Sequence, residues 1–568
     1  MRYKIRLVLA WLCICQVGIA QSIAWQQLTI TRVHLLMQRH QLSCQQLVAH
    51  YLERIRRYDL SLQAGAPLNA IVAINPAVLD SARRLDQQFA DSGQLQGALH
   101  CIPIIVKDNI ATTHTPSTSG TLVMLGSQPN QNATLVNRLQ RAGAIIIGKA
   151  GMDELASGMA GMSGRSGRIG NAYDPLQSPG GSSAGTAVAV SAGFALVGIG
   201  TDNSGSVRIP AAFNGLTGIR PTAGLISRQG IFPRGNLDGV AGVMARDVGD
   251  VTRVLAVLAK RADPHDPLSQ TLQRGYQPPQ QYLQVNALAG KRIGVVEQVA
   301  DINPYDVSDP ATLALFAQAK QHLKQAGAML VAVKLPGFNS QRQDNMAGEV
   351  QEINQYLASF PNPRPNYRAL CASGRVTIFA SIDACFVHLQ ETAAKGSVRY
   401  QQVLAMFKAN RAYVEKIMRA QHLAALLLPL NAAGGPSYHI RHVNTWRAPI
   451  ASNAGLPAVT IIAGFNQQHP ALPVGMELIA LPEQDFQLLG MAYAYQQQAP
   501  ALPLPILHTS RYADRLVNLS IYDLNNLFTL IGYKAYIQFL QHRDTLFIPA
   551  KPFGALVKQI LATFKSTP

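Results

Sequence analysis

The sequence is short of charge, and of acidic residues in particular. Charged residues make up only 14% of the 568 positions, where about 25% is usual. The 31 Asp and Glu residues face 49 Lys and Arg residues, which gives a formal net charge of +18. With so few charges, little of the surface can consist of helices joined by salt bridges. The 48% hydrophobic content, in turn, excludes a disordered or solvating chain.

Long apolar runs are also missing beyond the N-terminus, so no later segment is expected to span a membrane. At the N-terminus, basic residues precede an apolar run at positions 7–19, and Gly18 and Ala20 fit a cleavage site before Gln21. This pattern predicts a signal peptide at 1–20 and an exported protein, periplasmic or secreted, of a bacterial envelope. An uncleaved anchor is the alternative. Removing the signal leaves a net charge of 46 − 31 = +15.

Cysteine is scarce, with six residues, two of which leave with the signal. The remaining four allow two disulfides in any of three pairings. We favour Cys371 with Cys385, which are close in sequence, and free buried thiols are the alternative for all four: Cys44, Cys101, Cys371 and Cys385.

Several ligand-binding and catalytic motifs are absent. The sequence has no G-x-x-x-x-G-K-[ST] loop, no H-E-x-x-H or Cys/His ligand spacing, and no G-x-S-x-G elbow. We therefore expect no cofactor and no metal. The densest basic run, at 54–57, falls on a predicted helix as a solvated face, so no nucleic-acid partner is expected.

Short apolar strands alternate with helices along most of the chain. An apolar strand at 102–106 leads into Lys107, a helix and strand follow at 135–142 and 144–147, and the alternation resumes near residue 292. This predicts an α/β protein with a mostly buried sheet. Residues 335–400 lack a clear period and suggest a substrate- or family-specific insertion.

Glycine is concentrated, with 22 of 45 residues between positions 143 and 242. Glycine at such density indicates positive φ angles or close approach of the backbone to a ligand. Within this segment Gly205 precedes Ser206, in a turn whose amides suit an oxyanion hole. A serine nucleophile needs a base, and no histidine lies near, so the nearest candidate is Lys107. Lysine serves as a base only when neutral, a state that burial favours.

The sequence resembles the amidase signature family. Residues 178–222, SPGGSSAGTAVAVSAGFALVGIGTDNSGSVRIPAAFNGLTGIRPT, follow the signature of that family nearly position for position. Residues 97–109 (GALHCIPIIVKDN) resemble its lysine strand, and 148–156 (GKAGMDELA) its connecting segment. Residues 453–457 and 472–477 resemble its closing elements.

The resemblance implies a Ser-Ser-Lys triad. Ser206 would be the nucleophile, Lys107 the base, and Ser182 the bridging serine after a cis peptide bond from Gly181. The oxyanion would be held by the amides of residues 203–206, with support from two charged side chains; these residues are Asn203, Ser204, Gly205, Ser206, Asp202 and Arg208. The chain departs from the family at Ser204, where a glycine is usual.

The resemblance also implies the fold and the domain plan. We expect a single large α/β domain at 21–500, in which helices cover both faces of a mixed twisted central sheet. Its core would be 95–260 and 420–500, with a variable insertion at 265–420. The resemblance ends near residue 500, and the two apolar stripes that follow predict a helical extension at 501–568.

The predicted activity is hydrolysis of a small-molecule amide to acid and amine through an acyl-enzyme, by a monomer or homodimer. We expect the acyl pocket to be built from residues 157–170, the stretch 335–400 and the region near 431–438. Two alternatives belong to other functional classes. One is a transamidase component, similar to the A chain of glutamine amidotransferases, in a tRNA-processing complex. The other is a non-catalytic basic protein in peripheral contact with a membrane surface through 501–568.

Overall fold

The computed structural model describes residues 23–59, 67–233, 239–272, 276–306, 308–340, 348–373, 375–376, 385, 396–430, 449–467 and 471–508. The predicted signal peptide and the two apolar stripes of the C-terminal extension lie outside these residues. Among the helices described, none has the length and apolar character that crossing a membrane requires.

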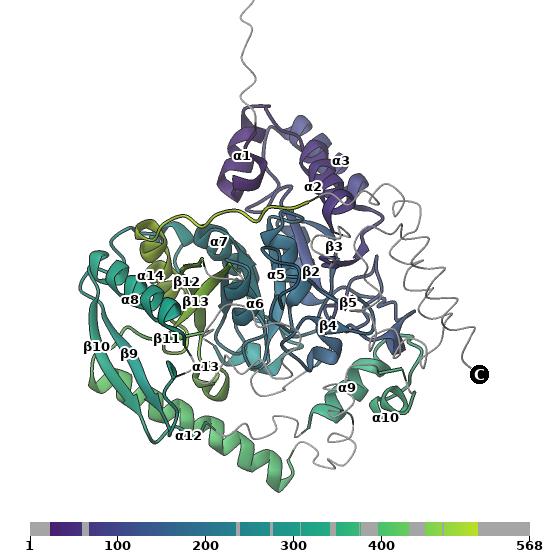
Figure 1. The fold of residues 1–568 in the computed structure, drawn as a ribbon. Helices are drawn as coiled ribbons and strands as arrows, with labels where there is room; N and C mark the ends of the chain where they lie inside the picture. The colour runs from purple at the N-terminus through teal and green to yellow at the C-terminus, as the bar shows by residue number, and fades with distance from the viewer. Residues whose placement is uncertain are drawn as a thin grey trace, which may run out of the picture.

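A single 11-stranded sheet of mixed direction runs through the described chain (Figure 1). The pairs β3–β2, β2–β6, β11–β9 and β9–β10 are parallel, and the other neighbouring pairs are antiparallel. The predicted mixed α/β class is therefore confirmed. In sheet order the strands are β1 (Ile71–Ile74), β3 (Ile145–Ala150), β2 (Pro103–Lys107), β6 (Val197–Asp202), β8 (Val240–Ala245), β7 (Thr217–Arg220), β12 (Ala458–Asn466), β13 (Leu472–Ile479), β11 (Ala425–Pro429), β9 (Arg292–Val299) and β10 (Met329–Leu335).

Helices pack on this sheet and around its edges (Figure 1). A short two-stranded sheet, β4 (Met162–Ser163) with β5 (Gly167–Arg168), lies apart from the large one. The α-helices are α1 (Ile30–Gln38), α2 (Cys44–Tyr58), α3 (Val78–Ser92), α4 (Thr134–Arg141), α5 (Ala184–Ser191), α6 (Arg208–Phe213), α7 (Val248–Ala259), α8 (Pro310–Gln325), α9 (Glu349–Ala358), α10 (Tyr367–Cys371), α12 (Val398–Ala420), α13 (Ile450–Ala454) and α14 (Asp485–Gln498).

Local sequence explains where the helices begin. Ser43 accepts a hydrogen bond from the Gln46 amide, and the Gln46 side chain accepts one from the Ser43 amide, which is a complete capping box for α2. In α8, Asp309 caps the helix and Pro310 occupies the first turn, where its missing N–H costs nothing.

The segment predicted as a variable insertion contains the strands that the alternation from residue 292 onward indicated. Its strands β9 and β10 belong to the central sheet, because β9 pairs in parallel with β11. The stretch at 335–400 also contains α9 and α10, of 10 and 5 residues, which are too short to show a helical period. A disulfide joins Cys371 to Cys385, which confirms the favoured pairing.

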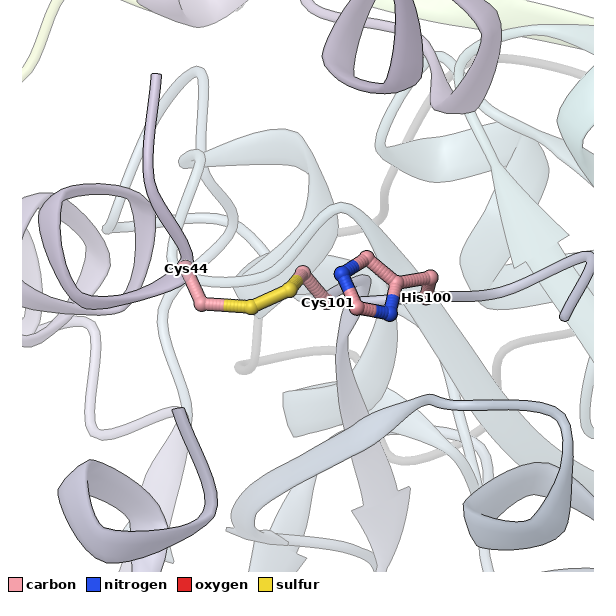
Figure 2. A group of neighbouring side chains, drawn as sticks. All are labelled: Cys44, His100 and Cys101. Carbon is pink, nitrogen blue, oxygen red and sulfur yellow. A yellow bond between two sulfur atoms is a disulfide. The ribbon is translucent and has the colours of Figure 1, made fainter. Parts of the chain in front are cut away.

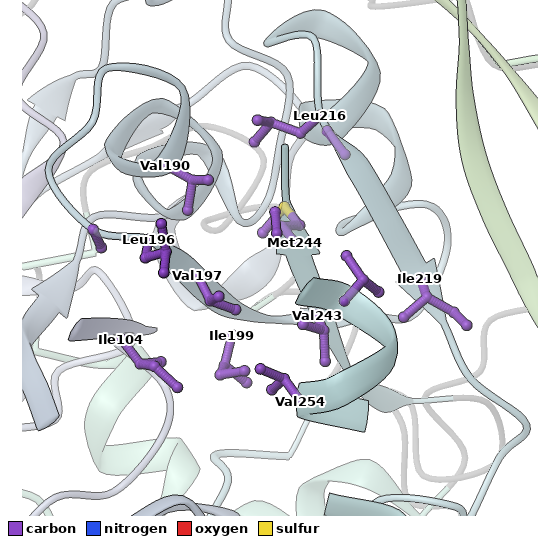
Figure 3. Packing of buried hydrophobic residues seen from close by; sticks show 14 of the residues in the cluster. Ile104, Val190, Leu196, Val197, Ile199, Leu216, Ile219, Val243, Met244 and Val254 are labelled. Carbon is purple, nitrogen blue, oxygen red and sulfur yellow. The ribbon is translucent and has the colours of Figure 1, made fainter. Parts of the chain in front are cut away.

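Glycines on one face of β6 bring helix α5 close to the sheet. A Cβ at Gly198 would lie 2.5 Å from Thr186 of α5, and one at Gly200 would lie 2.6 Å from the Ser183 hydroxyl. The alternate residues of the strand face the other way, as Figure 3 shows for Ile199 beside Val254 of α7. Part of the glycine excess therefore serves helix–sheet packing around the loops that carry the predicted catalytic residues.

Candidate active site

Lys107 is the last residue of β2, and its side chain is fully buried. The apolar residues before it anchor the strand between β3 and β6, so that Lys107 points from a rigid element. Its Nζ lies 2.7 Å from Ser182 Oγ and 2.9 Å from Thr201 Oγ1. The structure therefore brings together two of the three predicted catalytic residues, which are 75 positions apart in the sequence.

Ser182 lies in the loop before α5, and the Gly181–Ser182 peptide bond is cis, as the family resemblance implied. The Ser182 side chain is fully buried. Its carbonyl accepts a hydrogen bond of 3.1 Å from the Asp153 amide, and its hydroxyl is the one that contacts Lys107. Ser182 is thus held by its main chain and by its side chain.

Ser206 lies in the turn between β6 and α6 and is 6% exposed. Its carbonyl accepts a hydrogen bond of 3.0 Å from the Ser183 amide, which places the turn against the Ser182 loop. Within the described chain no hydrogen bond joins the Ser182 and Ser206 hydroxyls. Such contacts are often loose in unliganded enzymes and tighten when substrate binds.

The carboxylate of Asp202 organises the turn that carries Ser206. It accepts hydrogen bonds from the amides of Gly205 at 2.9 Å and Val207 at 3.0 Å. Arg208 and Arg220 also donate to it, and all three charged side chains are fully buried. Burial alone would raise the pKa of Asp202, but the two guanidinium groups hold it well below its usual range. Asp202 is therefore a fixed anion at the base of the turn.

The bond from Gly205 to Asp202 changes the predicted oxyanion hole. Four amides were expected to face the oxyanion, but that of Gly205 is already bonded to a carboxylate. In the part of the chain described, the amides of Asn203, Ser204 and Ser206 make no such bond, and they remain the available donors. Gly205 has a φ of 118°, which an L side chain rarely adopts, so its role is to shape the turn.

The environment of Lys107 favours its neutral form. Burial lowers its pKa to about 7, although Asp153 and Asp202 act in the opposite direction. A lysine with this pKa is neutral in a large fraction of molecules near neutral pH, as a general base must be. The arrangement suits proton transfer from a serine to an amine inside the protein.

Comparison with known proteins agrees with this geometry. The family model described as Amidase matches residues 46–489. The chain belongs to the amidase family. In structure it is similar to the native peptide amidase of Stenotrophomonas maltophilia, with a TM-score of 0.76 and 30% identity over 86% of this chain and 100% of that one. An amidase family protein of Bacillus anthracis has a TM-score of 0.74 and 26% identity, covering 85% and 92%.

In sequence the chain is also similar to the A component of a glutamyl-tRNA(Gln) amidotransferase from Symbiobacterium thermophilum. The two are 31% identical over 490 residues, which cover 83% of this chain and 96% of that one. The predicted family and the general activity, cleavage of an amide C–N bond by an amidase-family enzyme, are thereby confirmed.

Some residues of this amidase site were missed in the sequence. Thr201 Oγ1 accepts hydrogen bonds from Lys107 and, at 3.1 Å, from Asn109 Nδ2. Arg220 and Glu477 complete the buried charge network around Asp202 and Arg208. Glu477 lies in the segment 472–477 that resembles the family, but no role was predicted for it, because it reaches the site only through the pairing of β12 with β13.

One group of potential metal ligands lies away from the amidase site, at Cys44, His100 and Cys101 (Figure 2). Both sulfur atoms are joined in a disulfide, which completes the second pair of cysteines. Disulfide sulfur is not the thiolate that binds metals. The group therefore links α2 to the segment before β2, and it holds no thiolate ligand.

A cleft of about 990 Å³ lies between α4 and the end of α7. Its lining includes Arg138, Arg141 and Lys260, and it does not include any of the three predicted catalytic residues. This cleft is therefore separate from the reacting groups. The acyl pocket was expected to involve the region near residues 431–438, which lies outside the described residues.

Proposed function

We propose that this protein is an exported amidase that hydrolyses a carboxylic amide through an acyl-enzyme on Ser206. The observation that carries the proposal is the 2.7 Å contact between Lys107 Nζ and Ser182 Oγ, two side chains that are both fully buried. A lysine beside a serine in a buried site is arranged to accept its proton.

The reaction follows from the order of these groups. Neutral Lys107 accepts the proton of Ser182 while Ser182 accepts that of Ser206, and Ser206 Oγ forms a bond to the amide carbon. The negative charge on oxygen is stabilised by backbone amides of the turn. When the C–N bond breaks, the proton returns through Ser182 to the leaving nitrogen. Water then attacks the ester and releases the acid.

We propose peptide amides as the preferred substrate class. The similarity to a peptide amidase, at 30% identity over the full length of that chain, supports this choice. A panel of peptide amides, fatty amides, aryl amides and simple carboxamides tests it by kcat/KM. The highest value is expected for the peptide amides, and a preference for any other class would refute the assignment.

A second candidate is the transamidase component, because curated relatives are the A components of glutamyl-tRNA(Gln) amidotransferases. It would act with partner proteins on glutamine. Copurification of such partners from the native source, with hydrolysis of glutamine by the assembled complex, would favour it over the free amidase.

Export is supported by the N-terminal pattern and by the two disulfides, because disulfides persist in oxidising compartments. Expression of the full chain in a Gram-negative host, followed by fractionation and mass analysis, tests it. Mature protein that begins at Gln21 in the periplasm is expected. Full-length chain in the cytosol would exclude export.

The nucleophile is tested with a serine-reactive phosphonate. Wild-type enzyme should be labelled at Ser206, and Ser206→Ala should be unlabelled. Lys107→Ala should lose about 10²–10⁴-fold in kcat, as is typical when a general base is removed. Lys107→Arg should not restore activity, because arginine stays protonated. Labelling of Ser206→Ala at the wild-type rate would disprove the assignment.

A further inference from the structure

Asp153 is a buried carboxylate between β3 and the short helix at Glu154–Ala156, and it is only 2% exposed. Its Oδ1 accepts hydrogen bonds of 3.1 Å from the amides of Ala160 and Gly161, and Oδ2 accepts one of 3.1 Å from Gly161. These contacts fix the carboxylate through backbone groups.

The same residue holds the loop that presents Ser182. Its amide donates a hydrogen bond of 3.1 Å to the Ser182 carbonyl. Its carboxylate lies directly against Gly181, because a Cβ at that position would collide with Asp153 Oδ2. Asp153 therefore contacts both sides of the Gly181–Ser182 peptide, with its main chain and with its side chain.

Two buried carboxylates face Lys107, and they differ in their partners. From β6 it is faced by Asp202, which is bonded to Arg208 and Arg220, and Arg208 is bonded in turn to Glu477. From the segment after β3 it is faced by Asp153.

The next buried cation belongs to another cluster. Lys149 of β3 donates to the Ile110 carbonyl and the Ser117 hydroxyl, beside Asp108 and Arg165. Among the described residues no cation forms an ion pair with Asp153. Asp153 is thus the anion near Lys107 that is bonded to backbone amides and, within the described chain, has no arginine partner, unlike Asp202.

We propose that Asp153 is a positioning residue that holds Ser182 beside Lys107 Nζ and supplies negative charge that favours the protonated form of Lys107. The inference rests on the proposed function. Burial raises the pKa of Asp153 to about 6, against the backbone amides and Lys107, so the group is charged at neutral pH. Its charge keeps the pKa of Lys107 from falling as far as burial alone would take it.

The test is the pH profile of Ser206 labelling by the phosphonate, together with that of kcat/KM. Asp153→Asn removes the charge and keeps the size. Its acid limb should move toward lower pH by about one unit, because an opposite charge nearby shifts a pKa by roughly 1–3 units. Asp153→Glu keeps the charge but displaces Ser182, so kcat should fall while the acid limb stays in place.

Asp485→Asn is the matched control. Asp485 is also a buried carboxylate, bonded to Thr222 outside the site, and burial raises its pKa to about 6. Its substitution should leave the acid limb unchanged. Thermal unfolding shows which variants are folded. If Asp153→Asn does not fold, the kcat and the acid limb of Asp153→Glu provide the test.

An acid limb that stays in place in folded Asp153→Asn, or that moves in Asp153→Glu, would overturn the inference. The proposed function is judged separately, since it fails if wild-type Ser206 is not labelled at all.

Discussion

The buried guanidinium of Arg208 is paired with the carboxylate of Glu477, which lies 269 positions later in the chain. Arg208 begins α6 directly after the turn that carries Ser206, and Glu477 lies on β13. The pair therefore ties the glycine-rich half of the amidase to the strands contributed by the second half. Asp202 is bonded to the same guanidinium, so the position of the turn depends on this connection.

Replacement of Arg208 should be strongly destabilising. Arg208→Met leaves Asp202 and Glu477 buried with fewer partners, and breaking a buried pair typically costs about 3–5 kcal/mol. The free energy of unfolding in urea measures this. Arg83→Met is the control, because its pair with Asp80 on α3 is exposed and should contribute about 1 kcal/mol or less. Equal losses in the two variants would contradict the expectation.

The rate should depend on pH through Lys107. Burial lowers its pKa to about 7, and the base is neutral only above that value. The activity is therefore expected to be full at higher pH and to fall about tenfold per unit as the pH drops below it. A kcat/KM profile from pH 5 to about 9 checks this. A flat profile across neutrality would be inconsistent with lysine as the base.

Gly205→Ala should reduce kcat by more than its loss of stability would explain. The residue has a φ of 118°, so a side chain would distort the turn that presents Ser206 and its amide. We expect kcat to fall by about 10²-fold or more, since loss of one oxyanion contact costs this much.

Gly93→Ala is a matched control for that substitution. Gly93 has a φ of 65° at the end of α3, with open space around it. This variant should lose about 1 kcal/mol of stability and no activity. If both variants retained wild-type kcat, the turn would not require glycine.

The two disulfides should contribute unequally to stability. Cys44 and Cys101 close a loop of 57 positions, and Cys371 and Cys385 close one of 14. In the chain-entropy model these loops correspond to about 4 and about 3 kcal/mol. Paired Cys→Ala variants, compared by urea unfolding under oxidising conditions, measure the difference. A larger loss for the shorter loop would point to a native-state contribution instead.

The sequence predicted those parts of the site that lie within continuous motifs. Lys107 at the end of an apolar strand, the Ser182 loop and the Ser206 turn all lie where the pattern placed them. Asp153 lies in the segment 148–156 that resembles the family, but no role was predicted for it, because an acidic residue after a strand is more often a solvated loop residue. Arg220 and Glu477 also lie in such segments, and their roles were missed because their contacts depend on which strands pair.

The glycine-rich segment was only partly understood from sequence. The turn at 203–206 accounts for one use of glycine, but Gly198 and Gly200 serve the contact of α5 with β6. A sequence does not reveal which face of a strand meets a small helix, because that depends on the three-dimensional order of the layers.

The edge position of β10 separates the chain that follows it from the catalytic strands without detaching that chain from the core. β10 is the last strand of the sheet, and the chain that follows it, through α9, α10 and α12, returns at β11. The strands β2 and β6 lie beyond β12 and β13, in the other half of the sheet. On its way the chain places α9 in one apolar cluster with Val123, Leu155 and Phe232, and α12 in another with Leu456. For protein engineering, an exchange of residues 349–420 would therefore have to rebuild both apolar contacts, while the pairing of β2 with β6 is left in place.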